Sequence, residues 1–97
     1  MLVELKKLNI VNEGYRRQIS LDKIFVNSSH VVSIRDYHAA SEFLLSEGLD
    51  RYSNQKFSLV KISTGSDTEE IIVFGSSADV YESFRKSSKK GKKILNG

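Results

Sequence analysis

The stretch FSLVKISTGSDTEEIIVFG, residues 57–75, predicts a β-hairpin and with it the class of the fold. Two segments rich in apolar and β-branched residues, 57–63 and 69–75, flank the polar segment TGSDT. A five-residue connection with glycine in second place is typical of a link between antiparallel strands. We therefore expect two paired strands of an antiparallel sheet here.

Three further strands are expected upstream of this hairpin. Residues 2–10 and 15–26 carry apolar residues at strand spacing, and the turn signal NEG at 12–14 separates them. This arrangement favours a second antiparallel hairpin. After the polar turn NSSH, the segment HVVSI at 30–34 predicts a third strand in which Val32 and Ile34 share one face.

A short helix is expected between the third strand and the hairpin at 57–75. The segment DYHAASEFLLSEG at 36–48 has apolar residues at helical spacing, with Asp36 as the expected N-cap. Gly48 is the expected C′ residue, and Leu49 is expected to contribute the hydrophobic contact of a Schellman ending.

A second helix is expected after the hairpin. Ser76 and Asp79 resemble a capping box, and Val80 and Phe84 lie four residues apart on the expected inner face. The apolar periodicity stops beyond Ser87, so we expect the helix to end there.

These elements predict an α+β fold with a mostly antiparallel sheet of about five strands, an inserted helix and a C-terminal helix that closes one face. Residues 1–87 are expected to form a single domain, and residues 88–97 a basic, disordered tail. The expected core consists of Leu8, Ile10, Ile19, Phe25, Val32, Ile34, Phe43, Leu59, Ile62, Ile72, Phe74, Val80 and Phe84.

Two segments together resemble a known layout: KIFVNSSHVVSI at 23–34 and LVKISTGSDTEEIIVFGSSADVYESF at 59–84. They are similar to the small β proteins of the FlbD/SwrD type from bacterial flagellar operons, with Asn27, Gly65, Ser76 or Ser77, and Val80 at matching positions. The same order is similar to the LytTR type of DNA-binding domain. The chain departs from the pattern in having Ser28 where a proline is expected and an extra helix within 35–56. The resemblance implies an architecture only.

The composition argues against most kinds of chemistry. The chain has no cysteine, which excludes disulfides, thiolate nucleophiles and cysteine-based metal sites. Neither His30 nor His38 belongs to a metal-ligand motif, and the chain has no Walker A sequence and no G-x-S-x-G nucleophile motif. We expect no catalytic residues, no metal, no cofactor and no enzymatic activity. With no secretory signal at the N-terminus and no apolar run of membrane-spanning length, a cytoplasmic protein is expected.

Charge is unevenly distributed along the chain. Residues 85–97 hold six basic residues and no acidic ones, whereas residues 1–84 hold nine basic and twelve acidic residues. The basic segment favours nucleic-acid binding by phosphate neutralisation, with Arg85, Lys86, Lys89, Lys90, Lys92 and Lys93 as the expected contacts. Arg16 and Arg17 are secondary candidates, and Tyr15, Tyr37 or Tyr52 would stack on bases. A solvated, solubilising tail is the alternative explanation of the same residues.

A protein-binding adaptor or inhibitor is the alternative function. It would act through the helix at 37–49, with Tyr37, Phe43, Leu44 and Leu45 as contacts, or through an exposed strand edge. We therefore expect a small regulatory protein of bacterial or bacteriophage type. Its partner would be nucleic acid or a host or regulatory protein, with homodimer formation left open and no membrane attachment.

Overall fold

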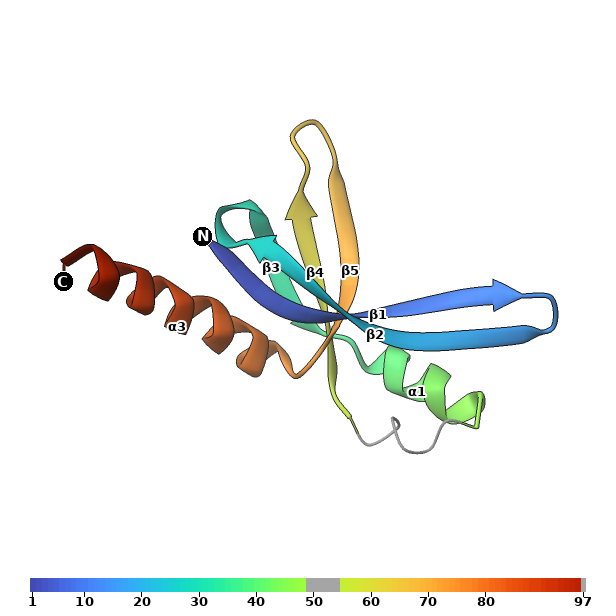
Figure 1. Ribbon diagram of the computed structural model, residues 1–97. Helices are drawn as coiled ribbons and strands as arrows, with labels where there is room; N and C mark the ends of the chain where they lie inside the picture. The colour runs from blue at the N-terminus through green and yellow to red at the C-terminus, as the bar shows by residue number, and fades with distance from the viewer. Residues whose placement is uncertain (49–54, 97) are drawn as a thin grey trace.

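The computed structural model describes residues 1–48 and 55–96, the side chains of Arg16 and of residues 87–96 excepted. In these residues it confirms the expected α+β fold, a five-stranded antiparallel sheet with two α-helices (Figure 1). The elements in chain order are β1 (Leu2–Glu13), β2 (Arg16–Asn27), the 3-10 turn η1 (Ser28–His30), β3 (Val31–Asp36), α1 (His38–Ser46), β4 (Phe57–Ser63), β5 (Thr68–Phe74) and α3 (Ser77–Asn96).

The sheet has the strand order β2-β1-β5-β4-β3, with every neighbouring pair antiparallel. Both expected hairpins are present. In β1–β2, Glu13 pairs with Arg16 across a two-residue turn, and in β4–β5, Ser63 pairs with Thr68. The contact between β1 and β5, with Lys7 opposite Val73, joins the two hairpins into one sheet.

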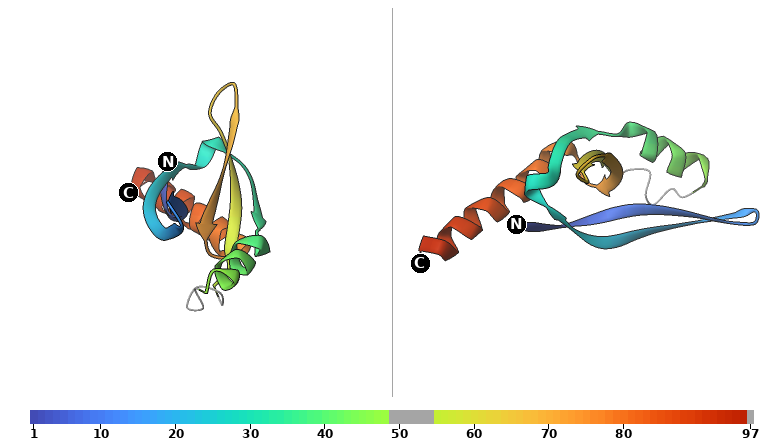
Figure 2. Two further views of the ribbon diagram at one scale, coloured as in Figure 1. Left: turned by 90° about the vertical axis from the view of Figure 1, so that its right-hand side faces the viewer. Right: turned by 90° about the horizontal axis from the view of Figure 1, so that it is seen from above.

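The two edges of this sheet meet at one end of the molecule. β2 and β3 are the edge strands, yet only Ser28–His30 separates them in sequence. The sheet therefore curls, as the view from above shows (Figure 2). Asn27 caps the connecting turn, since its Oδ1 accepts hydrogen bonds from the backbone N–H of Ser29 at 3.0 Å and from its hydroxyl at 2.8 Å.

Both faces of the sheet carry a helix. The face that α3 covers, called here the α3 face, includes Val3 and Leu5 of β1, Val60 of β4 and Val73 of β5. Val80 and Phe84 of α3 pack against these residues. The opposite face, called the α1 face, is built around Leu8 and Phe57, on which Ala40 and Leu44 of α1 pack. The C-terminal helix thus closes one face, as expected.

Some of the residues that were expected in the core lie on the surface instead. Four residues that were expected in the core are exposed: Phe25 at 59%, Val32 at 57%, Ile10 at 41% and Phe74 at 39%. In β3 a bulge between Val31 and Ser33 shifts the register. Val31 and Ile34 pack on the α3 face, whereas Val32, at the bulge, is mostly exposed and is not part of the core.

The C-terminal helix is longer than the apolar pattern predicts. The sequence predicts its end near Ser87, whereas the backbone of α3 continues to Asn96. Residues 88–96 therefore extend the helix instead of forming the expected disordered tail. Lysine and serine are compatible with a helix, and a single interior glycine costs only about 1 kcal/mol relative to alanine. Figure 1 and the right-hand view of Figure 2 show this half of α3 running past the end of the sheet.

Candidate functional site

The start of α3 is held by two side chains from different elements. Ser76 is the N-cap, as expected, since its Oγ accepts a hydrogen bond from the backbone N–H of Asp79 at 3.2 Å. Asp36, at the end of β3, accepts a hydrogen bond from the backbone N–H of Ser77 at 2.8 Å. Together these contacts fix where the helix leaves the sheet.

Asp36 was expected to cap α1, but it caps α3 instead. The N-cap position of α1 is Tyr37, which makes no side-chain capping hydrogen bond. The hydrogen bond from the Ser77 backbone lowers the pKa of Asp36 below its ordinary value of 3.8. An ionised carboxylate at a helix N-terminus also complements the positive end of the helix dipole.

The basic residues of the C-terminal segment lie on this anchored helix. Val80 and Phe84 are buried in the core, and the basic positions follow directly after them. The backbone positions of Lys89, Lys90, Lys92 and Lys93 all belong to α3. Lys86 precedes them and its side chain is exposed. The expected phosphate contacts are thus brought together on one element.

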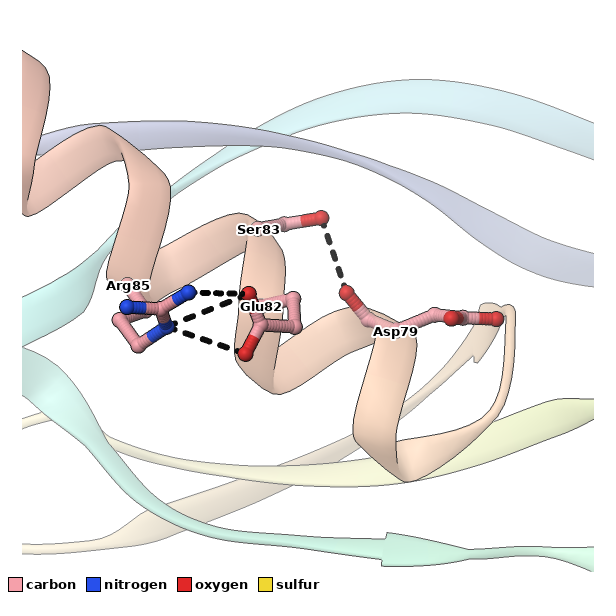
Figure 3. A network of polar contacts seen from close by, with 4 residues as sticks. All are labelled: Asp79, Glu82, Ser83 and Arg85. Carbon is pink, nitrogen blue, oxygen red and sulfur yellow. Dashed lines mark hydrogen bonds and ion pairs between the residues drawn. The ribbon is translucent and has the colours of Figure 1, made fainter.

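Arg85 is paired with Glu82 of the same helix (Figure 3). Its Nε lies 3.0 and 3.2 Å from the two carboxylate oxygens of Glu82, and its Nη2 lies 2.9 Å from Oε2. This bidentate contact raises the pKa of Arg85. The guanidinium of Arg85 is therefore less available to a ligand than the sequence predicts.

Arg16 and Arg17 lie at the other end of the molecule. The tip of the β1–β2 hairpin and the C-terminal end of α3 point in opposite directions (Figures 1 and 2). Arg17 pairs with Glu47 at 2.5 Å, and its guanidinium carbon lies 5.4 Å from the ring centroid of Phe43. The structure therefore does not join these arginines to the lysines, and Arg17 connects β2 to the end of α1.

The tyrosines proposed for base stacking are also scattered. Tyr15 is fully exposed at the hairpin tip, whereas Tyr37 packs in the cluster around Leu8. Tyr52 lies outside the described residues. Of the tyrosines named from the sequence, the two that the structure describes, Tyr15 and Tyr37, do not form a common stacking surface.

Most of the residues proposed for protein binding on α1 cover the sheet. Leu44 is completely buried, and Tyr37 and Phe43 pack against the α1 face. Only Leu45 is mainly exposed, at 58%. The contact of Leu49 expected after the helix lies outside the described residues, while Gly48 has the expected positive φ of 75°.

A groove between β3 and α3 was not located from the sequence. It has a volume of about 560 Å³ and is lined by Ser28, Val31, Val32, Ser33, Ile34, Ser77, Ala78, Tyr81 and Phe84. Tyr81, which the sequence places beside the apolar face of the helix, is 58% exposed on its α3 wall. The only signal of this groove in the sequence was the pair of β-branched residues Val31 and Val32 next to a turn. The apolar pattern of β3 alone did not reveal the bulge.

The described residues contain neither a metal-binding cluster nor a membrane-spanning helix. No group of three or more histidine or acidic side chains there is arranged to hold a metal ion. In that same part of the chain, no helix combines the length and hydropathy needed to cross a bilayer.

Comparison with known proteins adds no relative. No protein-family model matches the chain, and neither curated proteins nor solved structures give a significant match.

Proposed function

We propose that this protein is a small, non-enzymatic regulatory protein of the cytoplasm, of bacterial or bacteriophage type, that binds nucleic acid. The proposed contacts are made to phosphates by the C-terminal half of α3. The observation that supports this proposal is the continuity of α3, which carries the basic positions on the same helix that Val80 and Phe84 anchor in the core.

An anchored helix suits this function better than a flexible tail does. A disordered segment loses conformational entropy when it becomes ordered on a ligand, and a preformed helix avoids much of that loss. Lys86, Lys90 and Lys93 recur at spacings of three or four residues, so these positions follow one side of the helix. Lysine contacts phosphate as a point charge and does not read bases in doing so. Binding with strong salt dependence and little sequence preference is expected.

The test is fluorescence anisotropy with labelled single-stranded DNA, double-stranded DNA and RNA at several salt concentrations. If all five lysines contact phosphates, the slope of log K against log salt is about −3.5 for single strands and about −4.5 for duplex DNA. A variant with Lys89, Lys90, Lys92 and Lys93 replaced by Gln should lose most of that slope and most of the affinity.

A matched control variant separates the effect of where the lysines lie from the effect of the protein's net charge. Replacing Lys6, Lys23, Lys56 and Lys61 by Gln removes the same charge from the sheet and its loops. The control should bind nearly as well as the unaltered protein. Equal weakening of both variants would contradict a site on α3, and failure of the unaltered protein to bind at low salt would reject nucleic-acid binding.

A further inference from the structure

The groove between β3 and α3 runs along the edge of a strand. Four consecutive residues of β3, Val31 to Ile34, line it. Successive side chains of a regular strand point to opposite faces, and the bulge between Val31 and Ser33 interrupts that alternation within this segment, so the lining is not confined to one face. Such a lining is compatible with a groove that follows the strand edge. β3 is an edge strand of the sheet, paired with β4 on its other side.

Such an edge presents backbone groups to a ligand. On the side away from β4, the N–H and C=O groups of an edge strand are available to another strand. The bulge in β3 adds Val32 at this point, and its side chain is 57% exposed beside the groove. The groove therefore combines a backbone template with an exposed apolar side chain.

The opposite wall of the groove is also apolar. Tyr81 of α3 is 58% exposed and Phe84 lies deeper, at the edge of the core. The hydroxyl-bearing residues Ser28, Ser33 and Ser77 complete the lining. A ligand that fits would place apolar side chains between Val32 and Tyr81 and extend its own backbone along β3.

The two ends of the groove differ. At one end, the hydrogen bond from Ser77 to Asp36 ties the start of α3 to the end of β3. At the other end, Ser28 and Phe84 line the groove, and the exposed Lys86 follows two residues further along α3. Arg85 in between is paired with Glu82. This end of the groove thus leads toward the half of the helix that has basic but no acidic residues, where a negatively charged group would be favoured.

We propose that this groove binds an extended peptide segment of another protein, which adds to β3 as a sixth strand. The segment places an apolar residue between Val32 and Tyr81 and an acidic residue toward Lys86. Strand addition of this kind takes affinity from main-chain hydrogen bonds and specificity from alternate side chains. The inference goes beyond nucleic-acid binding and rests on different residues, apart from Lys86.

A library of random decapeptides displayed on phage, selected against the full chain, provides the probe. Enriched sequences should alternate apolar residues and carry Asp or Glu at one end. A synthetic peptide with an enriched sequence should bind the full chain in fluorescence polarisation. Absence of any enriched sequence overturns the proposal.

Variants then locate the peptide. Tyr81→Ala should weaken binding roughly tenfold or more, as loss of a central aromatic contact does, whereas Tyr15→Ala, at the exposed hairpin tip, should leave it unchanged. Val32→Thr, which keeps the shape of the side chain, should also weaken binding and serves as a second variant if Tyr81→Ala does not fold. Unchanged affinity in both groove variants overturns the proposal.

The charge contribution is tested by a double exchange. Lys86→Glu should weaken binding of the acid-ended peptide, and replacing the peptide's acidic residue by lysine should restore it. Absence of this reciprocal effect contradicts the proposed direction of the peptide.

Strand addition has its own signature. Only alternate N–H groups of an added strand face β3, so methylating those nitrogens should abolish binding and methylating the others should not. Equal effects of both sets overturn the proposal. Sedimentation of the unaltered protein addresses self-association, since a dimer that Tyr81→Ala dissociates would assign the groove to a second copy of the chain and overturn the peptide proposal.

Discussion

Asp36 shows how one exposed side chain connects two elements that are distant in sequence. It is the last residue of β3, and its carboxylate accepts the hydrogen bond from Ser77 that begins α3. That hydrogen bond lowers the pKa of Asp36, so the folded state favours the ionised carboxylate more than the unfolded chain does. The stability it contributes is present above the ordinary pKa of 3.8 and is lost as pH falls through the lower, folded value.

Asp36→Asn should therefore destabilise the protein at neutral pH, and the difference from the unaltered protein should shrink as the pH falls below about 4. Urea unfolding of both proteins between about pH 2 and pH 7 measures this difference. Asp67→Asn, in the turn between β4 and β5, is the matched control. A difference that stays constant with pH would show that Asp36 acts through packing and not through its charge.

Gly75 is the second residue whose identity the structure explains. Its φ is +113°, a conformation that side-chain-bearing residues rarely adopt, and it lies between β5 and α3. Its N–H donates to the carbonyl of Lys56 at 2.7 Å, and its carbonyl accepts from the buried Ser58 hydroxyl at 2.7 Å. These two contacts hold the backbone where it is.

Gly75→Ala should lower the free energy of unfolding by about 1–3 kcal/mol, because the strained φ is retained by the contacts around it. An added Cβ would lie 3.6 Å from Cγ2 of Val80, an ordinary distance, so strain and not a clash is the cause. Denaturant unfolding measures the effect, with Ser66→Ala in the exposed β4–β5 turn as the control. A loss no greater than that of the control would contradict the argument.

At the scale of elements, α3 combines an anchored half and a projecting half. Phe84→Ala should lower the free energy of unfolding by about 3–5 kcal/mol, since it removes a buried aromatic ring from the α3 face. Lys86→Ala, two residues further on and exposed, should change it by about 0.5 kcal/mol or less. Chemical denaturation of the two variants measures both values, and similar losses would mean that Phe84 is not a core anchor.

The order and type of the elements could be predicted from local patterns in the sequence. Which side chains of each strand are buried could not. Turn residues and β-branched segments predict both hairpins correctly, because these signals act within a few residues. Since α3 covers one face of the sheet and α1 the other, β1 buries Leu5 on the first face and Leu8 on the second. Alternation on a single face therefore led to a wrong core assignment for Phe25, whereas the one for Val32 was wrong because of the bulge in β3.

The candidate site was only partly accessible from the sequence. The uneven charge identified the lysines of α3, because charge is a direct property of composition. The groove depends on a bulge at Val32 and on the approach of β3 to α3, which are products of tertiary packing. The pairing of Arg17 with Glu47 is likewise a contact between elements that no local pattern encodes.

At the scale of the whole molecule, the two basic regions are separated. The molecule measures 53 × 31 × 19 Å, and the hairpin tip and the end of α3 lie at opposite ends of it (Figure 1). A DNA duplex of 10 base pairs is only about 34 Å long. A variant with Arg16 and Arg17 replaced by Gln should therefore bind this duplex as tightly as the unaltered protein does.

Anisotropy with the 10-base-pair duplex and with one of 30 base pairs measures this separation. An effect of the arginine variant on the long duplex alone would indicate a second contact at the hairpin tip. A strong effect on the short duplex would contradict the arrangement described here.

The antiparallel contact between β1 and β5 has a consequence for synthesis on the ribosome. Lys7 of β1 pairs with Val73 of β5. The hairpin of β1 and β2 is complete at Asn27, so more than forty further residues must be synthesised before its neighbouring strand β5 exists. At about 5–20 residues per second, translation leaves it without that neighbour for roughly 2–9 seconds. During this interval Val3, Leu5 and Val26 have neither β5 nor α3 to cover them. Until α3 has been made, these apolar side chains therefore lack the cover that they have in the folded protein.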